Sequence, residues 1–196
     1  PVILDAKRGD IATTAEAYAT ACFDVMGADA ATVNPYLGGD GVRPFLSRPD
    51  RTAFVLCRTS NPSAPDLQDL EVPTADGGTE PAYMRVAALA NEWNAEHQNV
   101  GLVVGATYPE ELSAIRTRCP DLPILLPGIG AQGGDLEASV AVGLDVAGGG
   151  LMLSASRAVL YASEDGDYAE AARAAADELR QAINVARAQR PASSLG

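Results

Sequence analysis

Short apolar runs alternate with segments of helical periodicity along the chain, and this alternation constrains the fold more than any other feature. The apolar runs lie at residues 1–4, 30–33, 52–57, 100–104, 123–126 and 150–153. The segments between and after them have helical spacing at residues 13–25, 41–46, 81–96, 109–118, 135–142, 157–161 and 168–188. At the start of the first of these segments, Thr13-x-x-Glu16 predicts a capping box, and Val25 follows at helical spacing. Strands that are apolar throughout are typical of parallel sheets covered on both faces. The sequence therefore predicts an α/β fold with six parallel strands.

Two architectures fit this order, a doubly wound sheet and a (β/α)8 TIM barrel. A complete barrel takes about 250 residues, so six βα units in 196 residues are about two units short. Because the chain starts directly in an apolar run, we expect the remaining units to precede Pro1. We predict a single barrel domain over residues 1–190 and a disordered tail over residues 191–196.

Composition excludes several classes of protein. Apolar residues make up 47% and charged residues 20% of the chain, which is typical of a folded globular domain. No apolar run is long enough to span a membrane. The net charge of −12 argues against a nucleic-acid binder, which needs a basic face. Cys22, Cys57 and Cys119 are far apart and form no CxxC pair, so we expect neither a zinc site nor disulfides, and a cytoplasmic location.

The first chemical motif is Asp5-Ala6-Lys7-Arg8-Gly9-Asp10, at the carboxyl end of the first predicted strand. Lys7 is the only lysine beside thirteen arginines, and lysine differs from arginine in being able to give up a proton. Residues i and i+2 of a strand point the same way, so Asp5 and Lys7 face one space, and a turn at Gly9 can bring Asp10 back. The motif therefore predicts a proton donor in an anionic pocket. A surface salt-bridge cluster is the alternative.

The second motif follows the fifth strand, where residues 127–135 read Pro-Gly-Ile-Gly-Ala-Gln-Gly-Gly-Asp. The GxGxxG pattern in it does not indicate a dinucleotide site, because the acidic Asp145 comes before the next strand rather than at its end. Glycine-rich backbone at a helix N-terminus offers N–H groups to phosphate. Together with Arg157 after the sixth strand, it predicts the phosphate site of a barrel.

Two further features leave alternatives open. Thr59 to Ser63 begin a polar loop of about twenty residues, long enough to suspect function, and their side chains either bind an amide-like ring edge or terminate the strand. His97, the only histidine, is predicted to be a solvated residue at a helix end, because nothing nearby resembles the turn of a nucleophile.

In combination, these residues resemble the orotidine 5′-phosphate decarboxylase family. The resemblance covers nearly the whole chain in family order: Asp-x-Lys-x-x-Asp-Ile at 5–11, Thr-Ser-Asn-Pro at 59–62, the glycine-rich loop at 127–135, and Ser-Arg at 156–157. The stretch Val-Asn-Pro-Tyr-Leu-Gly at 33–38 points to a bacterial subgroup with longer chains. The first motif is shared with other barrels, including 3-keto-6-phosphogulonate decarboxylases. The combination with the glutamine-bearing loop is more specific.

The resemblance implies a TIM barrel that decarboxylates orotidine 5′-monophosphate to uridine 5′-monophosphate (UMP). Lys7 would protonate C6 of the pyrimidine as carbon dioxide leaves, and Asp5 would lie near the departing carboxylate. Asp10 would come from the other subunit of a homodimer. Ile11 and Thr14 would reach the partner's nucleotide beside Asp10.

The remaining implied roles concern the rest of the nucleotide. Ser60 would contact the pyrimidine, Arg157 would hold the phosphate, and Gln132 would bridge from the phosphate towards Ser60 as its loop closes. No metal or organic cofactor is implied. The family's site also uses an aspartate and a lysine from the two strands that precede this motif.

Two other functions remain open. One is a metal-dependent sugar-phosphate decarboxylase or epimerase on the same scaffold, against which Gln132 and the Ser60 segment argue. The other is a catalytically incomplete fragment that only binds phosphorylated ligands.

Overall fold

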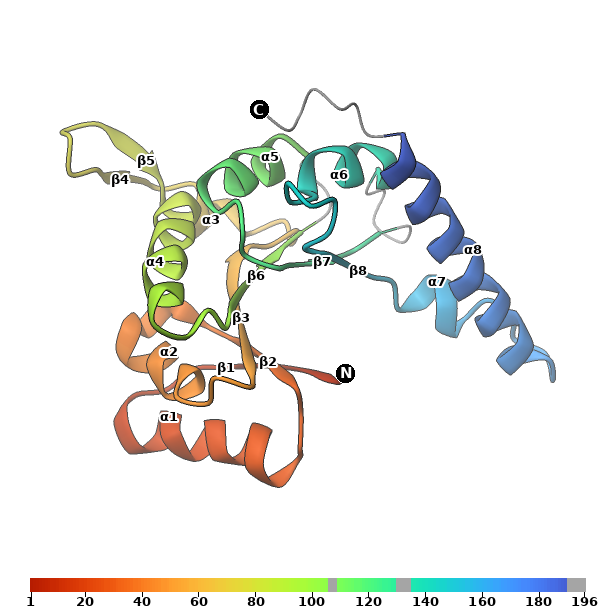
Figure 1. Ribbon diagram of the computed structural model, residues 1–196, viewed down its shortest axis with the longest axis horizontal. Helices are drawn as coiled ribbons and strands as arrows, with labels where there is room; N and C mark the ends of the chain where they lie inside the picture. Colours follow the sequence, from red (N-terminus) through yellow and green to blue (C-terminus); the bar gives the residue numbers. More distant parts are fainter. Residues whose placement is uncertain (106–108, 130–134, 190–196) are drawn as a thin grey trace. The chain divides into compact units, whose positions relative to one another are not determined.

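The computed structural model describes residues 1–105, 109–129 and 135–189 (Figure 1). Its strands are β1 (Ile3–Arg8), β2 (Ala30–Val33), β3 (Thr52–Arg58), β4 (Glu71–Pro73), β5 (Thr79–Pro81), β6 (Val100–Val104), β7 (Ile124–Pro127) and β8 (Leu151–Ser154). Its helices are α1 (Ala12–Ala19), α2 (Gly39–Leu46), α3 (Pro65–Gln68), α4 (Ala82–His97), α5 (Pro109–Arg118), α6 (Leu136–Gly143), α7 (Arg157–Leu160) and α8 (Tyr168–Ala188). A π-helical segment η1 (Thr20–Val25) and a 3₁₀ turn η2 (Pro35–Leu37) complete the set.

Six strands form one sheet in the order β1-β2-β3-β6-β7-β8, and β4 pairs with β5 in a separate hairpin. The pairings β1–β2, β2–β3, β3–β6 and β6–β7 are parallel, as predicted. The chain divides into two compact units. The first comprises Pro1–Val104 and Leu122–Leu125, and the second comprises the described residues of Gly105–Asp121 and Leu126–Gly196, so that β7 contributes to both.

The first unit has an apolar core on its strands. Ala30, Phe54 and Val103 form a buried cluster against which Ile3 and Leu56 pack. Burying a large apolar side chain contributes roughly 1.5–3 kcal/mol, so this cluster holds neighbouring strands in register. Helices α2 and α4 pack against β3, and α4 also packs against β6 (Figure 1).

The second unit is organised around α6, which packs against α5 and α8. Its core cluster contains Val140, Leu144 and Ala186. The buried Arg116 guanidinium donates to the backbone carbonyls of Gly143 and Gly150, which ties the end of α6 and the start of β8 to α5. Such bonds satisfy carbonyls that would otherwise be buried without partners.

Some local expectations were wrong. The pattern Thr13-x-x-Glu16 suggested a capping box, yet α1 begins at Ala12 with Ile11 as its N-cap and no side-chain cap. Val25 follows at the spacing of an α-helix, yet its side chain is 77% exposed. The helix changes from α-helical to π-helical geometry in η1, which alters the side-chain spacing.

The strands and the long loop also differ from expectation. Strands β1 and β8 are only partly buried, whereas β2 and β6 are buried throughout. The long polar loop contains α3 and the β4–β5 hairpin. The predicted tail at residues 191–196 lies outside the described residues.

Candidate active site

Asp5 and Lys7 meet at the carboxyl end of β1. The Lys7 Nζ atom lies 2.6 Å from Asp5 Oδ1, and both side chains are more than half exposed. The register between β1 and β2 shifts between Leu4 and Arg8, and Lys7 takes a φ of +47° at this irregularity. Left-handed backbone is uncommon for lysine, and such strain gathers at functional sites. The exposed Asp5–Lys7 ion pair therefore depends on a left-handed backbone conformation at Lys7, and the surrounding residues of β1 and β2 must stabilise that conformation.

Thr32, on β2, holds this backbone and was not singled out by the sequence reasoning. Its Oγ1 accepts a hydrogen bond from the Lys7 backbone N–H at 2.8 Å and donates to Asp5 Oδ1 at 2.9 Å. The side chain is fully buried. Because the register shifts here, the Lys7 N–H bonds the Thr32 hydroxyl instead of a backbone carbonyl of β2. The available signal was a hydroxyl within an otherwise apolar run.

The same contacts set the charge of Asp5. Partial burial by itself would raise the pKa of this carboxyl, because desolvation disfavours the charged form. The hydrogen bonds from Lys7 and Thr32 and the charge of Lys7 outweigh burial, so that the pKa lies below its ordinary value of 3.8. Asp5 is therefore a carboxylate that places negative charge beside the lysine ammonium.

The turn after β1 carries Asp10, Ile11 and Thr14. Asp10 Oδ1 accepts a hydrogen bond from the Ile11 N–H at 2.8 Å, and the Ile11 side chain is 54% exposed. Thr14 is exposed in the first turn of α1. Within the described part of this chain, the Lys7 ammonium pairs with Asp5 and not with Asp10. The spacing had suggested that a turn at Gly9 brings Asp10 back to Lys7. In the described part of one chain, the turn does not do so.

Ser60 lies just beyond the end of β3 and is half-buried. The preceding residue, Thr59, is bonded through both its N–H and its hydroxyl to the side-chain amide of Gln68. Thr59 thus terminates the strand, which was one of the two readings of this segment. Sequence reasoning did not identify Gln68, whose only local signal was an amide within a polar loop.

The second unit contains the predicted phosphate-binding residues. Arg157 is exposed at the first residue of α7. Gly128 has a φ of +99° in the turn that follows β7. Asp135 Oδ1 accepts from the Ala138 N–H at 2.9 Å and caps α6, as expected for a glycine-rich turn that opens a helix. Gln132 lies outside the described residues.

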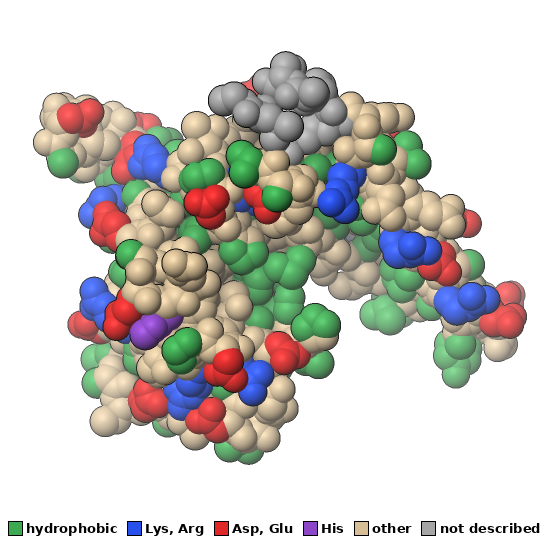
Figure 2. All heavy atoms as spheres, in the orientation of Figure 1, with side chains coloured by type: hydrophobic (Ala, Val, Ile, Leu, Met, Phe, Trp, Pro, Cys, Tyr) green, Lys and Arg blue, Asp and Glu red, His purple; other side chains and the backbone are tan. Residues whose placement is uncertain are grey.

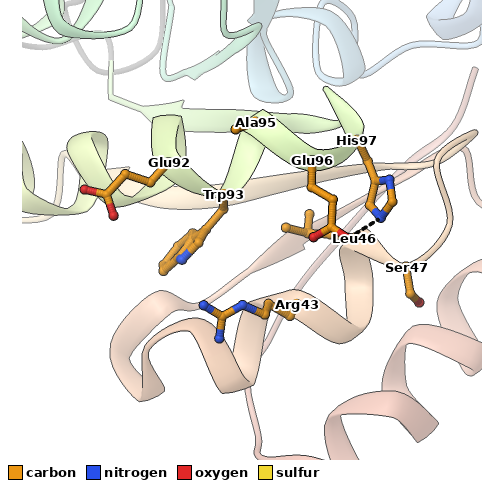
Figure 3. A pocket seen from close by; sticks show the side chains of 8 residues that line it. All are labelled: Arg43, Leu46, Ser47, Glu92, Trp93, Ala95, Glu96 and His97. Atoms are coloured by element: carbon orange, nitrogen blue, oxygen red, sulfur yellow. Dashed lines mark ion pairs between the residues drawn. The ribbon is translucent and has the colours of Figure 1, made fainter.

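A cavity of about 570 Å³ lies between α2 and α4, and none of the predicted site residues lines it (Figure 3). Trp93, Glu96 and His97 line it from α4, and Arg43 lines it from α2. His97 Nε2 lies 3.5 Å from Glu96 Oε1. The His97 side chain is 31% exposed beside the exposed Glu96, and Figure 2 shows charged side chains spread over this face of the molecule. This agrees with the expected position of His97 at a helix end.

The described residues contain neither a candidate membrane span nor a candidate metal cluster. No helix in residues 1–105, 109–129 and 135–189 is long and apolar enough to cross a membrane. Over the same residues, no three His, Cys, Asp or Glu side chains gather into a group that could hold a metal ion.

Comparison with protein families identifies the family to which the chain belongs. The model of the orotidine 5′-phosphate decarboxylase / HUMPS family matches residues 1–175. The chain belongs to this family. A family match over most of the chain also settles the fold: the six βα units are those of a (β/α)8 TIM barrel, as the alternation of strands and helices had suggested.

Relatives of the family are similar over nearly the whole chain. The chain is 57% identical over 183 residues to orotidine 5′-phosphate decarboxylase of Thermomicrobium roseum, covering 93% of this chain and 64% of that protein. The structure of Leishmania donovani OMP decarboxylase is 47% identical with a TM-score of 0.84, over 95% of this chain and 68% of that one. The Methanocaldococcus jannaschii enzyme, solved with the inhibitor BMP, is 25% identical with a TM-score of 0.67, over 91% and 72%. The chain thus spans about two thirds of the length of its relatives.

Proposed function

We propose that this chain carries the decarboxylation centre of an enzyme that converts orotidine 5′-monophosphate to UMP in pyrimidine biosynthesis. The observation that supports this most directly is the Asp5–Lys7 pair at the carboxyl end of β1, locked by Thr32. Active sites of parallel α/β barrels lie at that end of their strands. The family membership supports the same reaction.

Lys7 is the proton donor in this proposal. The bond between C6 of the pyrimidine and its carboxylate breaks, the electron pair stays on C6, and carbon dioxide leaves. The Lys7 ammonium stabilises the developing negative charge and passes its proton to C6, and water restores that proton afterwards. The ion pair with Asp5 holds the ammonium at a fixed position before substrate arrives, so that little reorganisation is needed.

Asp5 acts on the group that leaves. Its carboxylate lies near the substrate carboxylate, and two like charges in proximity repel one another. Loss of carbon dioxide removes that repulsion. A residue that remains ionised is required for this role, and the hydrogen bonds to Asp5 favour ionisation.

The other predicted residues bind the substrate. Arg157 and the glycine-rich turn hold the phosphate, Gln132 bridges from the phosphate to Ser60, and Ser60 contacts the pyrimidine. Binding of the remote phosphate can drive loop closure that excludes water from the reacting carbon.

A second subunit completes the site. Asp10 reaches the active site of the partner in a homodimer, and Ile11 and Thr14 contact the nucleotide beside it. The exposure of Ile11 and the position of Asp10 away from Lys7 in its own chain support this arrangement. We expect the enzyme to be cytoplasmic and to need no metal or organic cofactor.

The test is turnover of orotidine 5′-monophosphate by the native polypeptide, with and without EDTA. We expect UMP and carbon dioxide to form equally under both conditions. Loss of activity with EDTA would favour a metal-dependent reaction on a sugar phosphate. Binding of UMP without turnover would favour a binding function instead.

A further inference from the structure

A buried guanidinium lies at the end of β3, two residues before Ser60. Arg58 is the last residue of β3 and is only 3% exposed, although arginine is rarely buried unless it is paired. Its Nη1 donates to Gln68 Oε1 at 3.2 Å, and its Nη2 lies 3.3 Å from the Asp69 carboxylate. Its guanidinium also lies over the ring of Tyr83, 5.5 Å from the centroid. The side chain is thus fixed from three sides.

Arg58 in turn fixes the orientation of the Gln68 amide. Because Arg58 and the Thr59 N–H both donate to Gln68 Oε1, the oxygen faces the strand end, and the Thr59 bond measures 2.9 Å. The Gln68 Nε2 then donates to Thr59 Oγ1 at 2.7 Å. Gln68 therefore satisfies both polar groups of Thr59 at the point where the strand ladder ends.

We call the hydrogen bonds of Arg58 and Gln68 around Thr59 the clamp. The clamp extends to the other side of Ser60. Thr59 Oγ1 donates to Asn61 Oδ1 at 2.6 Å, and the Ala64 N–H donates to the Asn61 carbonyl at 3.0 Å. The Gln68 N–H donates to the Ala64 carbonyl at 2.9 Å, which closes the loop back on α3. Both neighbours of Ser60 are therefore held by a network that originates at Arg58 and Gln68.

We propose that Gln68, oriented by the buried Arg58, is a positioning residue that sets the place of Ser60 and thereby the selectivity of the site for the pyrimidine ring. This inference rests on the proposed function, since Ser60 is there the residue that contacts the base. Gln68 acts through Thr59 and Asn61 rather than by touching the nucleotide. A hydroxyl that binds a ring edge must be held within a fraction of an ångström, and hydrogen bonds from side chains can hold it beyond the last residue of β3.

The first experiment compares two ligands in Gln68→Leu. UMP carries the base and the phosphate, and ribose 5-phosphate carries the phosphate alone. We expect the dissociation constant of UMP to rise on the order of tenfold, because displaced polar groups lose their hydrogen bonds, and that of ribose 5-phosphate to change less than twofold. Equal weakening of both ligands, or no weakening of UMP, would overturn the proposal.

Two other variants separate positioning from loss of stability. Leu67→Gln is the matched control, because it exchanges the same two residue types in reverse at the neighbouring, 60% exposed position, and it should change neither ligand. Thr59→Val removes the hydroxyl that Gln68 binds and keeps the branched shape. If Gln68 acts through Thr59, the double variant should weaken UMP no more than the stronger single variant. Additive losses would contradict the clamp.

Amide hydrogen exchange on the unliganded chain tests the clamp apart from the proposed function. In Gln68→Leu, the amides of residues 59–61 should exchange at least tenfold faster, while those of residues 53–56 in β3 remain protected. Unchanged exchange at residues 59–61 would overturn the proposal even if UMP binds. If wild-type chain binds no UMP, the proposed function fails, and this arm still decides whether Gln68 orders the loop.

Discussion

The hydroxyl of Thr32 connects Asp5 and Lys7 of β1 to the neighbouring strand β2. It is buried, it bonds the backbone of Lys7 and the carboxylate of Asp5, and it lies 25 residues further along the chain than Lys7. Removing it while keeping the side-chain shape leaves the Lys7 N–H without its acceptor, and Asp5 Oδ1 keeps only the hydrogen bond from the Lys7 ammonium. A buried polar group that loses its partner costs about 1–3 kcal/mol.

Thr32→Val is therefore expected to raise the pKa of Asp5 towards its ordinary value of 3.8. Because the folded-state pKa is lowered, the stability that Asp5 contributes is present above 3.8 and is lost as the pH falls through the folded value. In Thr32→Val, the free energy of unfolding should therefore fall less on acidification than in wild type. Turnover should fall about 5–100-fold. Carbon-13 NMR titration of the Asp5 carboxyl measures the first effect. Thr32→Ser, which keeps the hydroxyl, should behave like wild type, and a shift in Thr32→Ser as large as in Thr32→Val would contradict this role.

Arg157→Ala tests the phosphate site. An arginine that pairs with phosphate makes strong charge-assisted hydrogen bonds, worth roughly 1.5–3 kcal/mol. We expect the dissociation constant of UMP to rise about 10–100-fold and that of uridine, which lacks phosphate, to stay within twofold. Calorimetry with both ligands measures this. An equal loss for uridine would remove Arg157 from the phosphate site.

The proximity of Asp5 and Lys7 could be predicted from the sequence, and the residues that support this pair and the Ser60 loop could not. The spacing of Asp5 and Lys7 within one strand predicted that they face one space, and they are 2.6 Å apart. Thr32 supports Asp5 and Lys7, and Gln68 supports the loop that carries Ser60, each from another segment of the chain. Their roles depend on which strand lies beside which, and no local pattern carries that information.

At the scale of elements, apolar periodicity located most strands and helices to within two residues, because burial on the sheet dictates it. The capping box failed for a tertiary reason. Glu16 does not cap α1 but pairs with Arg48, whose Nη2 lies 3.0 Å from Glu16 and 2.7 Å from Asp24. A distant arginine thus competes successfully for the carboxylate that the local pattern assigned to the helix end.

The packing of β6 on β3 depends on one glycine. A Cβ atom at position 101 would lie 2.5 Å from the ring of Phe54 and 2.9 Å from the backbone oxygen of Pro123. The backbone cannot yield cheaply, so Gly101→Ala should lower the free energy of unfolding by about 1–3 kcal/mol or more. Denaturant melts measure this. Gly166→Ala is the control, because its Cβ would meet nothing. Equal stability of the two variants would contradict the packing described for these strands.

At the scale of the whole molecule, the proposed homodimer shares its active sites. Lys7→Ala and Asp10→Ala homodimers should each be inactive, because each removes one residue from both sites. After subunit exchange, one site of every hybrid dimer has both residues intact, so about a quarter of wild-type activity should return in an equal mixture, since random exchange yields about half hybrids with one intact site each. No recovery despite exchange shown by mass spectrometry would mean that the sites are not shared.

In the proposed reaction, the ammonium of Lys7 on β1 performs the decarboxylation. The most direct measurement is the release of labelled carbon dioxide from carboxyl-labelled orotidine 5′-monophosphate by the native polypeptide and by its Lys7→Ala and Lys7→Arg variants. Arginine keeps the positive charge but does not give up its proton at neutral pH. We expect release by wild type and a loss of at least a thousandfold in both variants, with UMP still bound by Lys7→Arg. Turnover within tenfold of wild type in either variant would contradict it.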